Sequence, residues 1–203
     1  MSDINIDTFL KSYWNYYLEL ESQFIATKKF VEFDISNHAT YSIEYLKLFQ
    51  AVCSEIDVVA KILAEEYDES FKKIKNTNIQ KWGYYIQLAY PNIESISVLF
   101  NRDYTIYPWR NWKYETHTNK KGALSYKLIK GKKTPFWWTA YNNVKHERTS
   151  LTMNGKTNYA LANQKNLIYS FAALFVLEML YLDSHKGKEN QPYTESQMFN
   201  LQL

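Results

Sequence analysis

The sequence is poor in cysteine, glycine and proline. Cys53 is the one cysteine among 203 residues, which excludes an internal disulfide and a cysteine-rich zinc site. Glycine occurs 5 times and proline 4 times, which is far below their usual frequencies of about 7% and 5%. Because turn-rich all-β folds need both residues, this composition favours long helices.

The chain also lacks segments typical of secretion or membrane insertion. Residues 1–7 include acidic side chains and no apolar stretch, so they do not resemble a signal peptide. The longest apolar stretch, residues 167–182, contains Ser170 and Glu178 and is too short and too polar to span a bilayer. We therefore expect a buried helix there, and a soluble, cytoplasmic protein with no membrane partner.

Familiar signatures of metal, cofactor and hydrolase chemistry are missing from the sequence. The four histidines have no metal-ligand spacing, and they are His38, His117, His146 and His185. There is no glycine-rich phosphate loop and no Gly-x-Ser-x-Gly motif. The sequence thus predicts neither a metal nor a cofactor.

The positive charge is concentrated in one part of the chain. Residues 110–148 hold ten basic and two acidic residues, a net charge of +8, so the rest of the chain carries −5 of the total +3. Four of the six tryptophans lie in or beside this segment, namely Trp109, Trp112, Trp137 and Trp138. Basic residues interleaved with aromatic ones suit a phosphate backbone and stacked bases. The alternative is a solvated, lysine-rich loop.

The apolar periodicity predicts a helical protein. Helical spacing is found over residues 6–32, 39–67, 79–89, 134–148 and 161–184. Between the third and fourth of these helices, residues 92–133 read as an irregular, partly extended basic flap. We therefore predict an all-α, four-to-five-helix bundle forming a single domain over residues 1–186, followed by a mobile C-terminal tail over residues 187–203.

The predicted helix of residues 134–148 contains the best candidate for chemistry. Asn142 and His146 are four residues apart, so they share one face of the helix, and Trp138 lies one turn earlier on that face. A histidine can exchange protons near neutral pH, and Lys145 and Arg148 could hold a phosphate beside it. This combination suits metal-independent cleavage of a phosphodiester. The alternative is a structural histidine that bonds to Asn142.

A helical bundle that carries Tyr141-Asn142-x-x-Lys145-His146 resembles the HEPN superfamily (higher eukaryote and prokaryote nucleotide-binding domains). The second predicted helix, with residues 53–61, is similar to the acidic helix that faces the motif helix in that family. Many members are metal-independent ribonucleases of toxin–antitoxin, abortive-infection and CRISPR systems, and they dimerise so that two motifs build one cleft. The resemblance implies an RNA-acting endoribonuclease of anti-phage defence or a toxin–antitoxin system, a homodimer, and an antitoxin or defence-protein partner.

The family motif can be carried over residue by residue. His146 matches the family histidine, and Asn142 matches the polar residue that follows the family arginine, whose position is taken by Tyr141. The implied catalytic set is His146, Asn142, Arg148 and Lys145. The implied RNA- or phosphate-binding set is Tyr141, Asn143, Trp138, Arg110, Lys132 and Lys133. Glu55 and Asp57 are the implied supporting acidic residues. Because tyrosine lacks a guanidinium group, the alternative is a non-catalytic module that binds a protein or nucleotide partner.

Overall fold

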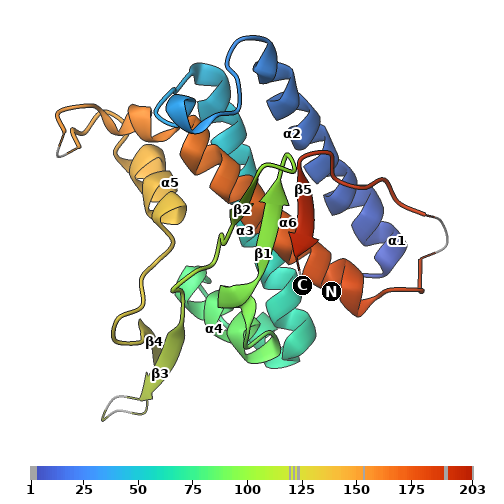
Figure 1. Ribbon diagram of the computed structural model, residues 1–203. Coiled ribbons are helices and arrows are strands. Elements are labelled where there is room, and N and C mark those ends of the chain that lie inside the picture. Colours follow the sequence, from blue (N-terminus) through green and yellow to red (C-terminus); the bar gives the residue numbers. More distant parts are fainter. Residues whose placement is uncertain are drawn as a thin grey trace.

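The structure is a computed structural model that describes residues 4–118, 120, 122, 124–152, 154–189 and 192–202. Its α-helices are α1 (Ile6–Phe9), α2 (Asn15–Ala26), α3 (Ile43–Tyr67), α4 (Ile79–Ala89), α5 (Phe136–His146) and α6 (Gln164–Ser184). A π-helical turn, Leu10–Trp14, joins α1 to α2. Helices α2 and α3 run antiparallel (Figure 1).

Helix α6 is the centre of the fold, because its side chains are buried nearly all round. It runs beside α3 in the same direction. The Cys53 thiol bonds to Ser170 in the first half of each helix, and Glu66 Oε1 lies 2.9 Å from His185 Nε2 at their C-terminal ends. By length and composition α6 could cross a membrane, but 72% of its apolar window is buried inside the protein. This burial fits the central helix expected from the sequence.

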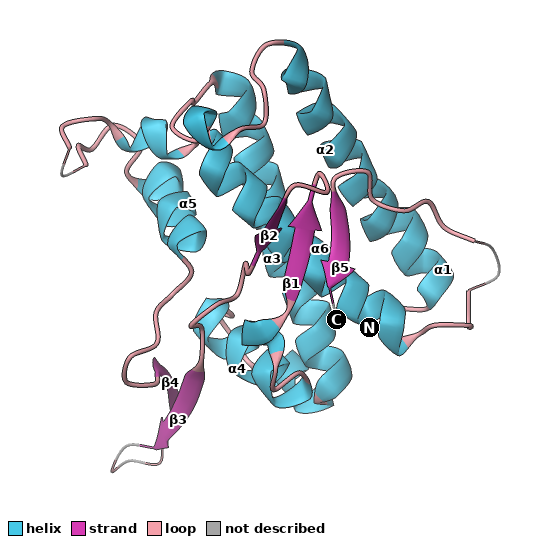
Figure 2. Ribbon diagram, in the orientation of Figure 1, coloured by secondary structure: helices cyan, strands magenta, loops and turns pink. Residues whose placement is uncertain are grey.

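The prediction of an all-α fold is wrong. Five strands form two antiparallel sheets among the described residues (Figure 2). They are β1 (Ser97–Phe100), β2 (Tyr104–Ile106), β3 (Tyr114–Thr118), β4 (Leu124–Leu128) and β5 (Phe199–Gln202). The first sheet has the order β2-β1-β5, and the second is the hairpin β3-β4, which projects from the body of the protein. The expected flap therefore contains β1 to β4.

The three-stranded sheet forms because its apolar side chains pack against α6. Phe100 of β1 pairs with Phe199 of β5, with ring centroids 5.3 Å apart, and Phe199 lies 5.8 Å from Phe175 of α6. Val98, Phe100 and Ile106 are all fully buried. Burial of this kind adds to the intrinsic strand preference of the valine, isoleucine and aromatic residues in these strands.

The segment expected as a mobile C-terminal tail, residues 187–203, contains β5, and the chain before this strand is attached to α2. The carboxylate of Glu21, on α2, is buried and accepts hydrogen bonds from the Tyr17 hydroxyl at 3.0 Å, the Gln197 N–H at 2.9 Å and the Met198 N–H at 3.2 Å. The Ser196 hydroxyl donates to the same carboxylate. These bonds fix the chain that leads into β5.

Candidate functional site

The tryptophans of the basic segment form a core cluster instead of a base-stacking surface. Trp109, Trp112 and Trp137 are fully buried. Trp82 of α4 contacts Trp109, Trp112 and Trp138, and Trp137 contacts both Trp109 and Trp138. The interpretation of the three fully buried rings as stacking partners for bases is therefore wrong. They hold the flap and the hairpin against α4 and α5.

Two contacts fix the base of the β3-β4 hairpin to α4. The Gln87 side chain donates to the Trp112 carbonyl at 3.0 Å and accepts from the Tyr114 N–H at 2.8 Å. Gly83, one turn earlier on α4, leaves room for the Trp112 ring, because a Cβ there would lie 2.4 Å from Trp112 Cζ2. The hairpin therefore leaves the body at a defined position.

Helix α5 forms one wall of a polar pocket of about 560 Å³. Five of the sequence-predicted site residues on α5 line it, namely Trp138, Tyr141, Asn142, Asn143 and Lys145, and Asp57 of α3 lies opposite. Most of the other lining residues carry hydroxyl or amide groups, and they are Ser54, Thr77, Asn78, Ile79, Gln80, Thr134 and Thr139. The pocket thus unites α3, α5 and the beginning of α4.

The sequence also contained a signal for the α4 side of this pocket. Asn78 is the N-cap of α4, and its side-chain oxygen accepts from the Gln80 and Lys81 N–H groups at 3.1 Å each. An asparagine directly before an apolar periodic segment is a typical helix start. Thr134, which precedes α5, is not the N-cap of that helix. Pro135 occupies that position, and its carbonyl accepts from Trp138 and Thr139.

The charged and aromatic groups of the pocket have defined partners. Asp57 accepts from Trp82 Nε1 at 3.0 Å with one oxygen and pairs with Lys61 through the other. Lys145 Nζ lies 5.5 Å from the centroid of the Tyr141 ring. Burial raises the pKa of Tyr141 to about 12, with smaller contributions from Cys53 and Asp57. The Tyr141 hydroxyl is therefore neutral near pH 7 and can donate a hydrogen bond.

His146 and Arg148 lie outside the pocket lining. His146 is the last residue of α5 and is exposed, and Arg148 is exposed two residues later. Within the described part of the chain, no hydrogen bond joins His146 to Asn142, so the structural bond considered from the sequence is not formed. The imidazole is open to solvent, about one helical turn beyond Asn142, which does line the pocket.

The remaining predicted site residues are dispersed. Arg110 stacks its guanidinium group on the Tyr107 ring at 5.7 Å, and Lys133 is exposed before α5. Lys132 pairs with Glu94 at 2.6 Å, so part of its charge is already neutralised.

Glu55 is on α3 with Asp57 but does not line the pocket. Burial raises the pKa of Glu55 to about 7, and its carboxyl interacts electrostatically with Glu178 of α6. The two supporting acidic residues implied by the resemblance are therefore separated, because Asp57 lines the pocket whereas half-buried Glu55 interacts with Glu178.

The described residues contain no group of three or more His, Cys, Asp or Glu side chains that could hold a metal ion. Comparisons of the chain with protein-family models, with curated proteins and with solved structures returned no match.

Proposed function

We propose that this protein binds RNA, with the pocket beside α5 holding one nucleotide and the basic hairpin holding the neighbouring phosphates. The observation that carries the proposal is the pocket itself, which combines the amides of Asn142 and Asn143 with the ammonium group of Lys145. Side-chain amides can pair with the edges of an unstacked base, and RNA is typically recognised through such bases. The volume is in the range of small-ligand sites.

The surroundings of the pocket supply the charge that a nucleic-acid backbone needs. Exposed cations follow the chain from the flap to the end of α5, and they are Arg110, Lys120, Lys127, Lys130, Lys133, Lys145 and Arg148. A chain of exposed cations attracts phosphates at long range, and this attraction weakens as salt is added. Trp138 and Tyr141 also line the pocket, and both are largely buried.

Fluorescence anisotropy with a labelled single-stranded RNA tests this proposal. We expect micromolar or tighter binding, with at least a tenfold loss for Asn142→Ala combined with Asn143→Ala. Lys47→Gln is the matched control, because Lys47 is an exposed cation on α3 that pairs with Glu44 at 2.8 Å. Absence of RNA binding, or equal losses in the pocket variant and the control, would contradict the proposal.

Cleavage of the bound RNA is a second candidate function, favoured by the exposure of His146 between Lys145 and Arg148. In this reaction the imidazole accepts the proton of a ribose 2′-hydroxyl, and the 2′-oxygen attacks the adjacent phosphorus. The bond to the 5′-oxygen breaks and that oxygen takes up a proton, which leaves a 2′,3′-cyclic phosphate and a 5′-hydroxyl. Lys145 and Arg148 would stabilise the negative charge on the phosphorane.

Incubation of the purified protein with total RNA in the presence of EDTA separates the two candidates. Cleavage that is lost in His146→Ala, while RNA binding persists, would support the ribonuclease assignment. Binding without any cleavage would support the alternative of a non-catalytic module, which is suggested by Tyr141 at the position of the family arginine. Cleavage at the wild-type rate in His146→Ala would reject the role of the histidine.

A further inference from the structure

The pocket beside α5 contains hydrogen-bonding groups that the fold does not use. Within the described part of the chain, the side-chain amides of Asn142 and Asn143 and the hydroxyl group of Ser54 make no hydrogen bond inside the protein. The same holds for the hydroxyl group of Tyr141. Groups of this kind can pair with a ligand without first giving up an internal bond, so the pocket suits a ligand with a polar edge.

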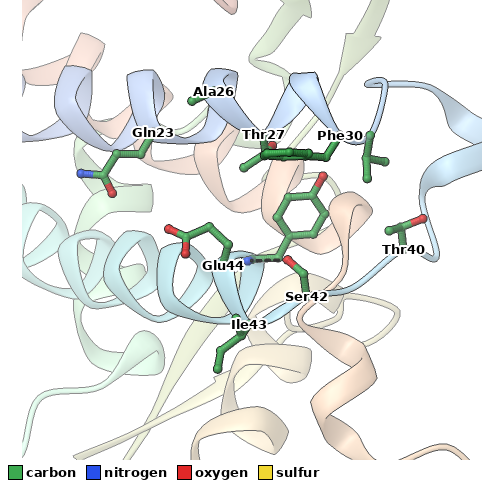
Figure 3. Close-up of a pocket in the computed structure, with 10 residues that line it drawn as sticks. Gln23, Ala26, Thr27, Phe30, Thr40, Ser42, Ile43 and Glu44 are labelled. Carbon is green, nitrogen blue, oxygen red and sulfur yellow. Dashed lines mark hydrogen bonds between the residues drawn. The ribbon is translucent and has the colours of Figure 1, made fainter.

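A second pocket, between the end of α2 and the beginning of α3, offers a contrast (Figure 3). Its volume of about 610 Å³ is close to the 560 Å³ of the α5 pocket. Two of its hydroxyl groups, however, serve the fold. The Thr27 hydroxyl donates to the Phe24 carbonyl at 2.6 Å, and the Ser42 hydroxyl accepts from the Tyr45 N–H at 3.1 Å, as Figure 3 shows. The two pockets therefore differ less in size than in the polar groups they leave free.

Asp57, the acidic residue of the α5 pocket, keeps the capacity to accept further hydrogen bonds. One oxygen of its carboxylate accepts from Trp82 Nε1 at 3.0 Å, and the other pairs with Lys61. A carboxylate has about four lone-pair sites, and the Asp57 side chain is 32% exposed. Each oxygen can therefore accept one more bond from a ligand in the pocket, while the two internal contacts fix the orientation of the carboxylate.

Tyr141 provides a donor near this acceptor. Both residues line the pocket, and the charge of Asp57 contributes to the raised pKa of Tyr141. The phenol is therefore protonated near pH 7 and can donate. Lys145 Nζ, which lies 5.5 Å from the centroid of the Tyr141 ring, adds a positive charge to the same wall. The pocket thus combines a pair of carboxylate acceptors with a neutral hydroxyl donor.

We propose that the α5 pocket selects guanine among the bases of RNA, with Asp57 accepting from N1–H and the 2-amino group and Tyr141 donating to O6. Guanine is the base whose Watson–Crick edge presents two adjacent donors beside one acceptor. Adenine and cytosine present one amino donor next to an acceptor, and uracil presents one N–H between two acceptors, so a carboxylate oxygen would oppose an acceptor in all three. RNA-binding proteins read unstacked bases at this edge. The inference rests on the proposed RNA-binding function and adds the identity of the base.

RNAs that differ in a single base test this selection without any change to the protein. Each is a labelled oligouridine with guanine, adenine or inosine at its centre, and fluorescence anisotropy gives its dissociation constant. We expect the guanine RNA to bind at least tenfold more tightly than the adenine RNA, because a bidentate contact discriminates by about this factor. Inosine lacks the 2-amino group, so its affinity should lie between the two. Guanosine and adenosine monophosphate, measured by isothermal titration calorimetry, should show the same order and separate the base from the RNA backbone.

Asp57→Asn tests the carboxylate directly. The amide keeps an oxygen for Trp82 Nε1 but replaces one acceptor by a donor, so the ratio of guanine to adenine affinity should fall to about threefold or less. Loss of the negative charge alone would strengthen the binding of both RNAs, so the ratio is the readout. Lys61→Met is the matched control, because it removes the same ion pair and leaves the carboxylate in place. Its ratio should equal that of the wild type, and circular dichroism verifies that both variants are folded.

The outcomes separate this inference from the proposed function. Equal binding of the guanine and adenine RNAs, together with a loss in the protein carrying both Asn142→Ala and Asn143→Ala, would overturn guanine selection and leave RNA binding intact. A guanine preference that survives Asp57→Asn, or that Lys61→Met abolishes equally, would overturn the role of Asp57. A preference among the monophosphates without tighter binding of RNA would support the inference and contradict the role of the hairpin. Absence of binding to every RNA and nucleotide would overturn both.

Discussion

Glu178 provides the sharpest test of the interior of the protein. Its carboxyl group lies on α6, is fully buried, and has no hydrogen-bond partner among the described residues. Burial raises the pKa of Glu178 well above its ordinary value of 4.5, and the charge of Glu55 raises it further. Tyr17, on α2, interacts electrostatically with Glu178 and also has a pKa raised by burial. The folded protein therefore holds Glu178 as a neutral acid.

The consequence is a stability that falls as the pH rises. The unfolded chain releases the Glu178 proton near pH 4.5, whereas the folded chain keeps it. Below pH 4.5 the group is protonated in both states, so it adds no pH-dependent cost. As the pH rises from 4.5 towards the folded pKa, the free energy of unfolding falls. Each pH unit between 4.5 and the folded pKa costs about 1.4 kcal/mol of unfolding free energy.

Replacement of Glu178 by glutamine should remove this dependence while keeping the shape of the side chain. Urea titrations of Glu178→Gln and the wild type at pH 5, 6 and 7 give the difference in unfolding free energy. We expect the variant to gain about 1.4 kcal/mol relative to the wild type with each pH unit. Near pH 4.5 the two proteins should be similar, because an unpaired buried amide and an unpaired buried acid carry similar penalties.

Two further variants make the Glu178 experiment specific. Glu147→Gln, at the exposed end of α5, is the surface control for the same substitution. Glu55→Gln removes a group whose pKa is raised to about 7, so the pH dependence of its effect should end near pH 7 and the effect should stay constant above it. A difference between Glu178→Gln and the wild type that stays constant from pH 5 to pH 7 would refute the neutral state of Glu178.

Other changes test the packing of the hairpin, the attachment of β5 and the binding of RNA. Gly83→Ala should destabilise the protein by about 2 kcal/mol or more, since the new Cβ would lie 2.4 Å from Trp112 Cζ2; an unchanged urea midpoint would contradict this packing. Glu21→Ala should lower the free energy of unfolding by about 3 kcal/mol and should raise amide hydrogen exchange at Met198. Unaltered exchange would contradict the attachment of β5 to Glu21. Raising the salt from 50 to 200 mM should weaken RNA binding about 50-fold for four phosphate contacts, and Lys145→Gln should lower the logarithmic slope by about 0.7; a salt-independent affinity would contradict the electrostatic account.

The long helices could be predicted from the sequence because their apolar residues recur at helical spacing. The predicted ranges 39–67 and 161–184 contain α3 and α6, and the range 79–89 coincides with α4. Pro91 marks the end of the region that holds α4, and α5 begins directly after Pro135. Local patterns of this kind depend on neighbours within a few residues, so one sequence is sufficient to read them.

The sheet and the attached C-terminus could not be predicted because they depend on distant partners. Val98 of β1 pairs with Leu201 of β5, and the tail is fixed by Glu21 on α2. No short-range pattern announces either contact, and the polar composition of residues 187–203 indicates mobility when it is considered alone. Strand pairing and buried anchors are properties of the folded chain.

The candidate site was predicted in part. The segment of α5 that the sequence singles out forms one wall of a polar pocket, since Asn142, Asn143 and Lys145 all line it; its role in catalysis or RNA binding stays a prediction. The exposure of His146 could not be read from spacing, because it depends on where α5 ends. The tryptophans were misread since aromatic side chains in a basic segment suit either a binding surface or a core, and only the packing around Trp82 decides between them.

Photocrosslinking of a single-stranded RNA containing 4-thiouridine tests the central claim most directly. The cross-linked peptides are identified by mass spectrometry, in the wild type and in the protein carrying both Asn142→Ala and Asn143→Ala. The account predicts adducts in α5, at Trp138 or Tyr141, together with adducts in the β3-β4 hairpin, and a loss of the α5 adducts in the variant. Adducts confined to other elements, or no adduct at all, would contradict it.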